Sequence, residues 1–228
     1  YVDADAGAGA GATTTLGNTV ITGGTKINAS SKVEFTAAQI TAAKNIIAAN
    51  QDTVAQGSVT VNGNASTTEV TVSQTAAQAA IGTGVNGQIE ITAGAVTIAD
   101  AKAGSATDAA TISTVTLNNY GNSTISSNAL STLNLSGTAG TLDLTTGLTT
   151  PTNTTLTMNL NKLSGANTIK DSTADTAGTN GAGYKTLNVN SSTADSTLVA
   201  LDFDDVETLN VSGDAKLTIT GNNSLVAV

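Results

Sequence analysis

Several residue types that carry chemistry are missing from this chain. It has no cysteine, histidine, tryptophan or arginine, and its eight basic residues are all lysines. Without cysteine it can form neither a disulfide framework nor a thiolate nucleophile, and without histidine it lacks the usual general base near neutral pH. Aromatic residues make up 2% of the chain, so platforms for stacking sugar rings are scarce. These absences predict that the protein is not an enzyme, and they argue against a polysaccharide hydrolase or lyase, which also needs positioned carboxylates.

Charge and the length of apolar runs narrow the choice of partners. The formal net charge is −9, whereas binding to phosphate backbones depends on Lys and Arg side chains. Nucleic acid is therefore not an expected partner, while divalent cations suit an acidic surface. No run of 18 apolar residues occurs, so insertion into a membrane is not expected.

The residues that are abundant predict an all-β fold. Threonine, serine, asparagine, alanine and glycine dominate, and hydrophobic residues make up 39% of the chain. Many of these hydrophobic residues alternate with polar ones, which is typical of strands buried on one face. Such a pattern argues against low-complexity disorder, in which too little apolar surface is available for burial.

The first half of the chain divides into a linker and a β-rich region. Residues 1–12 are small and flexible in composition, so we expect a linker there. Residues 13–112 are expected to form a β-rich region with one amphipathic helix at about 37–50. Thr36 and Gln39 have the spacing of a capping box at the start of that helix. A separate β-sandwich over 13–112 is an open alternative.

Short strands are expected within this region as neighbouring pairs. The pairs are 18–21 with 25–27, 58–62 with 69–73, and 88–92 with 95–99. Gly23 and Gly24 between the first two strands can supply positive φ at low cost. One or two helical turns are expected over 75–81.

Residues 113–228 contain a repeat. Each copy has a Thr-Leu/Met-Asn core, and the copies begin at Thr116, Thr132, Thr157, Thr186 and Thr208. Steps of 16 to 29 residues between copies are typical of stacked structural repeats, so we expect irregular β-solenoid (β-helix-like) repeats. Residues 224–228 look like the beginning of a further, truncated copy, and the chain is expected to be a piece of a longer protein.

Alternation along each copy predicts which side chains face the interior. Because successive side chains of a strand point to opposite faces, every second residue is expected inside. The expected inward residues are Leu133, Leu135, Leu187, Val189, Leu209 and Val211, and the expected outward residues are Asn134, Asn188 and Asn210.

Three stretches are informative: TLNLSGTAGTLDLTTG at 132–147, VETLNVSGDAKLTITG at 206–221, and VTIADAKAGSATDAATISTVTLNNYG at 96–121. They resemble bacterial surface-layer (S-layer) proteins of the RTX-related group exported by type I secretion. The resemblance implies an extracellular protein on the bacterial cell surface, which assembles with identical subunits into a lattice and uses calcium. The calcium-binding nonapeptide GGxGxDxUx of that group is absent, so no calcium ligand is carried over from it.

The densest group of carboxylates lies in the sequence LDFDDVE at 201–207. Asp202, Asp204 and Asp205 are candidate Ca²⁺ ligands there, because calcium prefers six to eight oxygen ligands. The alternative interpretation is a solvated acidic face ahead of a turn, since no D-x-D-x-D-G loop completes the pattern. Weaker candidate pairs are Asp171 with Asp175 and Asp100 with Asp108.

Together these features predict a non-enzymatic structural module of a secreted, self-assembling S-layer protein. The alternative is an adhesin or biofilm-matrix module that binds a host or surface ligand. Cell-surface polysaccharide is a further expected partner, through parts of the protein outside this chain. Ice binding through outward threonines such as Thr218 and Thr220 is disfavoured, because coil lengths vary and a regular array requires regular spacing.

Overall fold

The computed structural model describes residues 13–33, 53–74, 78–80, 88–103, 105, 107–145, 154–165, 167–172, 183–221 and 224–225. All regular structure within these ranges is β-strand, which confirms the all-β prediction. The helix predicted over 37–50 and the linker predicted over 1–12 lie outside the described residues.

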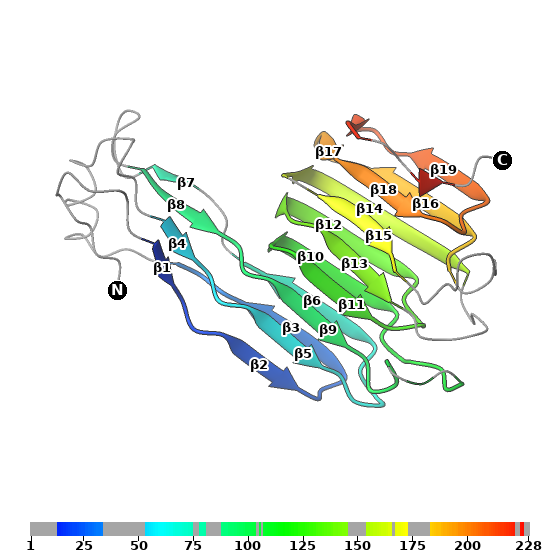
Figure 1. The fold of residues 1–228 in the computed structure, drawn as a ribbon, viewed down its shortest axis with the longest axis horizontal. Helices are drawn as coiled ribbons and strands as arrows, with labels where there is room; N and C mark the ends of the chain where they lie inside the picture. The colour runs from blue at the N-terminus through cyan, green and yellow to red at the C-terminus, as the bar shows by residue number, and fades with distance from the viewer. Residues whose placement is uncertain are drawn as a thin grey trace.

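Two long sheets, parallel throughout, make up most of the molecule (Figure 1). The seven-stranded sheet contains, in spatial order, β3 (Lys26–Ser30), β6 (Glu69–Ser73), β10 (Thr114–Tyr120), β12 (Thr132–Ala139), β14 (Thr155–Ser164), β16 (Thr186–Ser191) and β19 (Thr208–Ser212). The eight-stranded sheet contains β2 (Thr19–Thr22), β5 (Val59–Asn62), β9 (Val96–Ala99), β11 (Ser123–Ser126), β13 (Leu142–Thr145), β15 (Thr168–Asp171), β18 (Ala200–Phe203) and β21 (Ser224–Leu225).

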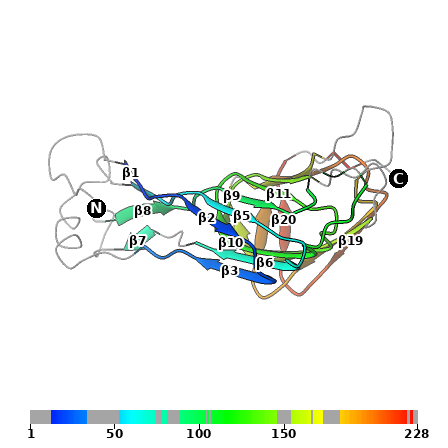
Figure 2. The same cartoon turned by 90° about the horizontal axis from the view of Figure 1, so that it is seen from below.

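The chain alternates between these sheets, so that one strand from each makes one coil of a β-solenoid. The coils are β2/β3, β5/β6, β9/β10, β11/β12, β13/β14, β15/β16 and β18/β19, numbered coil 1 to coil 7 below, and β21 follows them. The two sheets form opposite walls of the stack (Figure 2). The strand pairs expected in the first half are therefore wrong as pairs, although the strands lie close to where the alternation placed them. Each strand bonds instead to its counterparts in the neighbouring coils. Strands inside the stack therefore have both edges covered, whereas the end strands β2, β3, β19 and β21 pair on one side only among the described strands.

Two smaller sheets lie beside the long ones. One has the order β1-β4-β8-β7, with β1 (Thr13–Thr15), β4 (Thr53–Ala55), β7 (Gln78–Ala80) and β8 (Gln88–Thr92); the other pairs β17 (Ser196–Leu198) with β20 (Leu217–Ile219). Strand β7 runs antiparallel to β8, so 78–80 is strand rather than the helical turn predicted for 75–81. Strands β1, β4 and β8 precede β2, β5 and β9, so among the described strands coils 1 to 3 have a third side that coils 4 to 6 lack.

The repeat continues through the whole described chain. Strand β10 pairs with β6 as well as with β12, so the strands before and after residue 112 belong to the same sheets. Paired residues in the seven-stranded sheet are 45 residues apart between coils 2 and 3, 18 between coils 3 and 4, and 31 between coils 5 and 6. Thr132 pairs with Thr157, and Thr186 with Thr208, as predicted.

Two of the four predicted steps between copies, from Thr116 to Thr132 and from Thr157 to Thr186, are wrong by two residues. Thr114, rather than Thr116, pairs with Thr132, and Thr155, rather than Thr157, pairs with Thr186. A shift by two preserves the side to which each residue points. The predicted inward and outward positions therefore remain correct despite the wrong register.

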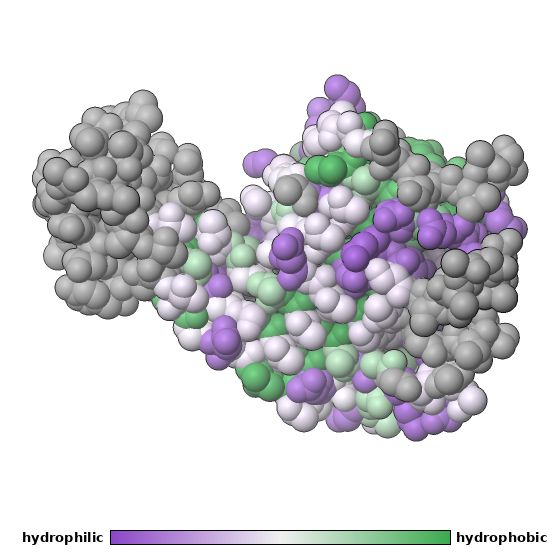
Figure 3. Space-filling view, in the orientation of Figure 1, coloured by the Kyte–Doolittle hydropathy of each residue, from purple (hydrophilic) through white to green (hydrophobic). Residues whose placement is uncertain are grey.

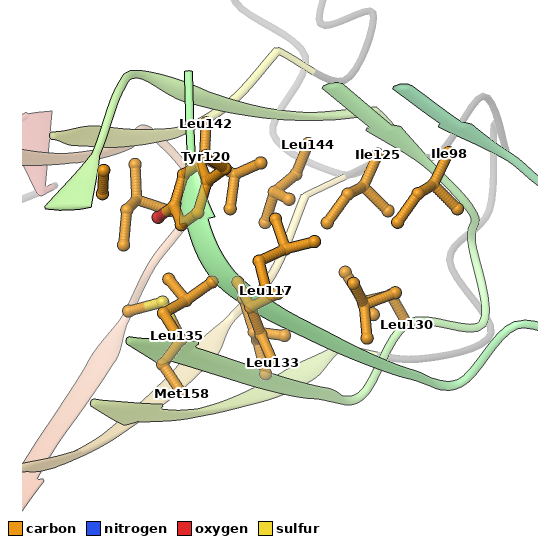
Figure 4. Packing of buried hydrophobic residues seen from close by; sticks show 14 of the residues in the cluster. Ile98, Leu117, Tyr120, Ile125, Leu130, Leu133, Leu135, Leu142, Leu144 and Met158 are labelled. Carbon is orange, nitrogen blue, oxygen red and sulfur yellow. The ribbon is translucent and has the colours of Figure 1, made fainter. Parts of the chain in front are cut away.

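The interior contains aliphatic side chains from both sheets. In Figure 4, Ile98, Ile125 and Leu144 of the eight-stranded sheet face Leu117 and Leu133 of the seven-stranded sheet. Residues at these inward positions of coils 2 to 6 are almost completely buried. Burial of aliphatic side chains between stacked coils is the main stabilising contribution to such a fold.

A column of glycines forms one corner of the stack. Its members are Gly17, Gly57, Gly94, Gly121 and Gly140, one in each of coils 1 to 5. A Cβ on Gly94 would overlap the carbonyl oxygen of Gly57, and a Cβ on Gly57 would overlap that of Gly17. Glycine is therefore needed at this corner because the backbones of successive coils approach closely.

Candidate functional site

Over β10, β12, β14, β16 and β19, the outer surface of the seven-stranded sheet is an array of hydroxyl and amide side chains. We call this surface the amide face; it consists of the outward residues Thr114, Thr116, Thr132, Asn134, Thr157, Asn159, Asn188, Asn190 and Asn210. These residues form rows that run across the strands, because outward residues in register stack on one another from coil to coil. The predicted outward residues Asn134, Asn188 and Asn210 all belong to it.

Hydrogen bonds join the asparagines into ladders along the stack. Asn190 donates to Asn159 (3.4 Å), and Asn159 donates through Nδ2 to Asn134 Oδ1 (2.8 Å). Asn134 in turn donates to the hydroxyl of Thr116 (3.0 Å). A second ladder runs in the same direction. Asn210 donates through Nδ2 to Asn188 Oδ1 (2.9 Å), and Asn188 donates to the hydroxyl of Thr157. Each bond fixes the orientation of an amide that would otherwise rotate.

Charge distinguishes the two long sheets in coils 3 to 7. In the seven-stranded sheet, β10, β12, β16 and β19 contain no charged residue, and β14 has only Lys162 near its end. The remaining charged residues of that sheet, Lys26 of β3 and Glu69 of β6, pair with each other at 2.8 Å. The eight-stranded sheet instead has an outward Asp143 that pairs with Lys170 at 3.1 Å, and Asp202 is next to Lys170 in register. Hydrophilic residues gather over the C-terminal coils in Figure 3.

The inward residues of β19, the second strand of coil 7, are unlike those of the strands before it in the seven-stranded sheet. Leu209 and Val211 occupy the positions at which Leu187 and Val189 lie in coil 6. Leu209 is 38% exposed and Val211 is 58% exposed, whereas Leu187 and Val189 are fully buried. Among the described strands, β19 pairs on one side only, with β16.

The three predicted calcium ligands have different surroundings. Asp202 points outward from β18 beside Lys170, and Asp204 is exposed in the following turn. Asp205 is buried, with Oδ2 accepting a hydrogen bond from the Gly183 backbone N–H (2.9 Å) and Oδ1 3.2 Å from Lys185 Nζ. The inward carboxylate thus has a structural function that links coil 7 to the chain ahead of β16.

The other acidic pairs are also separated. Asp100 is buried and accepts hydrogen bonds from the backbone N–H groups of Lys102, Thr111 and Ile112, so it closes the loop between β9 and β10. Asp108 pairs with Lys102 on the surface (3.1 Å), which lowers the pKa of the Asp108 carboxyl. Asp175 lies outside the described residues. Within the described ranges no group of three or more acidic side chains is placed to hold a metal ion, and calcium binding stays a prediction.

Two tyrosines lie inside the stack. Tyr184 donates its hydroxyl to the backbone carbonyl of Leu130 (2.8 Å) and packs against Phe203, with ring centroids 6.4 Å apart. The Tyr120 hydroxyl is buried without a hydrogen-bond partner. Burial raises the pKa of both phenols well above the usual value, with the Asp171 carboxylate adding to the effect at Tyr184. Both side chains are therefore neutral packing groups.

Comparison with known proteins adds no family assignment, since no protein-family model and no curated protein sequence matches the chain significantly. A helix long and apolar enough to cross a membrane is not found among the described residues.

Some residues of these surfaces were not singled out from the sequence. The ladder members Asn159 and Asn190 and the glycine column were missed. A signal for the glycines was present: each lies three residues before an outward residue of the eight-stranded sheet, as in Gly57 with Thr60 and Gly94 with Thr97. Searching for glycine at that spacing would have extended the repeat to coil 1.

Proposed function

We propose that this chain is a structural module of a secreted, self-assembling bacterial cell-surface protein of the S-layer type, and that it has no enzymatic activity. The observation that best supports the proposal is the stack of seven coils, which presents long pleated polar surfaces. Stacked repeats generate extended binding surfaces from short sequence units. Identical copies of the protein are its expected partners, on the outside of the cell.

Electron microscopy of the purified protein, with and without calcium, tests this proposal. Ordered two-dimensional arrays are expected. An adhesin or biofilm-matrix module is the second candidate, because the hydroxyl and amide groups of the amide face could also bind a neutral glycan. Absence of arrays and of any self-association, together with binding to cells or to cell-surface polysaccharide, would replace the first proposal with the second.

Calcium is part of this proposal, and chelation tests it separately. A ligand that binds only the folded state stabilises that state by mass action. Excess chelator is therefore expected to lower the Tm in differential scanning calorimetry, and added calcium is expected to restore it. A melting curve that does not change with chelator would remove calcium from the proposal for this chain.

A further inference from the structure

All members of the amide face are uncharged, although the protein as a whole is acidic. The net charge is −9, and carboxylates are found on the eight-stranded sheet at Asp143 and Asp202. The outward positions of β10, β12, β16 and β19 carry no charge. Two copies that met through their eight-stranded sheets would bring Asp143 and Asp202 of one copy near those of the other, which costs binding free energy.

The same face is also prepared for hydrogen bonding. An asparagine side chain has two N–H donors and an oxygen with two lone pairs. Within the ladder, Asn159 uses one donor towards Asn134 and accepts one bond from Asn190. Asn159 therefore keeps one donor and one acceptor for a partner, and so does Asn134. Because the ladder already fixes the amide orientation, little side-chain entropy is left to lose on binding.

We infer that the amide face is a self-association surface, against which the amide face of a second copy docks. This inference rests on the proposed function and names the surface through which the module assembles. A contact between two identical faces is isologous, so every outward amide and hydroxyl meets the same kind of group on the partner. A neutral glycan is the other occupant that such a face could take.

Variants of opposite charge distinguish two effects: the burial of a charge in the contact, and the long-range repulsion between two acidic molecules. Asn159→Asp and Thr132→Lys place a charge on the amide face, the first raising and the second lowering the net negative charge. Thr97→Asp and Thr97→Lys are the matched controls, because Thr97 is an exposed outward residue of the eight-stranded sheet. Sedimentation velocity over a range of protein concentrations measures self-association, and circular dichroism with thermal melting checks that each variant is folded.

Both amide-face variants are expected to weaken self-association at least about tenfold, because an unpaired charge would be buried in the contact. Both Thr97 variants should associate like the parent protein. If the parent associates and the amide-face variants associate equally well, the inference is overturned while the proposed function stands. If the parent is monomeric at all concentrations, with and without calcium, both fail. Thr132→Lys, which breaks no asparagine ladder bond, decides the outcome if Asn159→Asp does not fold.

Discussion

Coils 6 and 7 contain the same tetrapeptide, Thr-Leu-Asn-Val, at 186–189 and at 208–211. The two copies are in register and adjacent in one sheet, yet Leu187 is fully buried and Leu209 is 38% exposed. The difference comes from the neighbours, because coil 6 has a coil on each side and the seven-stranded sheet ends at β19 among the described strands. In such a fold, the stabilisation that a side chain contributes depends on contacts between coils.

The largest difference is expected for the matched leucines. Leu187→Ala should lower the free energy of unfolding by about 4 kcal/mol, because it leaves a cavity between two coils. Leu209→Ala should cost about 1 kcal/mol or less, since its side chain is partly in water already. Urea unfolding of both variants measures the two losses. Equal losses would show that coil 7 is covered in solution as completely as coil 6.

The glycine column gives a second, smaller contrast between covered and open positions. Gly94→Ala should cost about 3 kcal/mol, because its Cβ would overlap backbone atoms of coil 2 and force the coils apart. Gly17→Ala, at which a Cβ would meet nothing within 4 Å, should change stability by no more than about 0.5 kcal/mol. Thermal melting of both variants tests this, and a tolerated Gly94→Ala would contradict the close approach of the coils.

The carboxylate of Asp205 tests how coil 7 is attached. Asp205→Ala should cost about 2 kcal/mol, because the Gly183 N–H loses its acceptor and Lys185 loses its nearer partner. Glu207→Ala is the control: its carboxylate is 3.7 Å from the same Lys185 nitrogen but its side chain is 71% exposed. That variant should stay within about 0.5 kcal/mol of the parent. Similar urea midpoints for the two variants would mean that the inward bond contributes nothing.

The smallest expected effect separates the two buried tyrosines. Tyr184→Phe should cost about 1 kcal/mol, because the hydroxyl bonded to Leu130 is lost. Tyr120→Phe should be neutral or slightly stabilising, because it removes a buried hydroxyl that has no partner. Calorimetry on both variants measures the difference. A loss at Tyr120 equal to that at Tyr184 would indicate a hydrogen bond to the Tyr120 hydroxyl in solution.

The sequence predicted the positions of the strands and the orientation of their side chains better than it predicted which strands pair. Period-two alternation located β5, β6, β8 and β9, because burial of one face requires it. Alternation could not identify which strands pair, since a parallel neighbour 45 residues away leaves no signal in the local sequence. Strands that follow one another in coils 1 to 3 were therefore wrongly predicted to pair with each other. The predicted registers of Thr116 with Thr132 and of Thr157 with Thr186 were wrong by two residues, because threonines recur at every second position in these strands.

The candidate site was predictable only in part. Outward asparagines followed from alternation, whereas the hydrogen bonds between them depend on register, which the repeat spacing left uncertain. Asp202, Asp204 and Asp205 lie within four consecutive residues, but the turn after β18 directs Asp205 inward towards Lys185. A cluster in the sequence is therefore not a cluster in space.

The unequal coil lengths have a consequence for the order of folding. Pairing β10 with β12 closes 18 residues, whereas pairing β6 with β10 closes 45. Loop-closure entropy makes the longer closure costlier by about 0.8 kcal/mol. Coils 3 and 4 therefore form the cheaper nucleus, from which the stack can grow in both directions by adding one strand pair at a time.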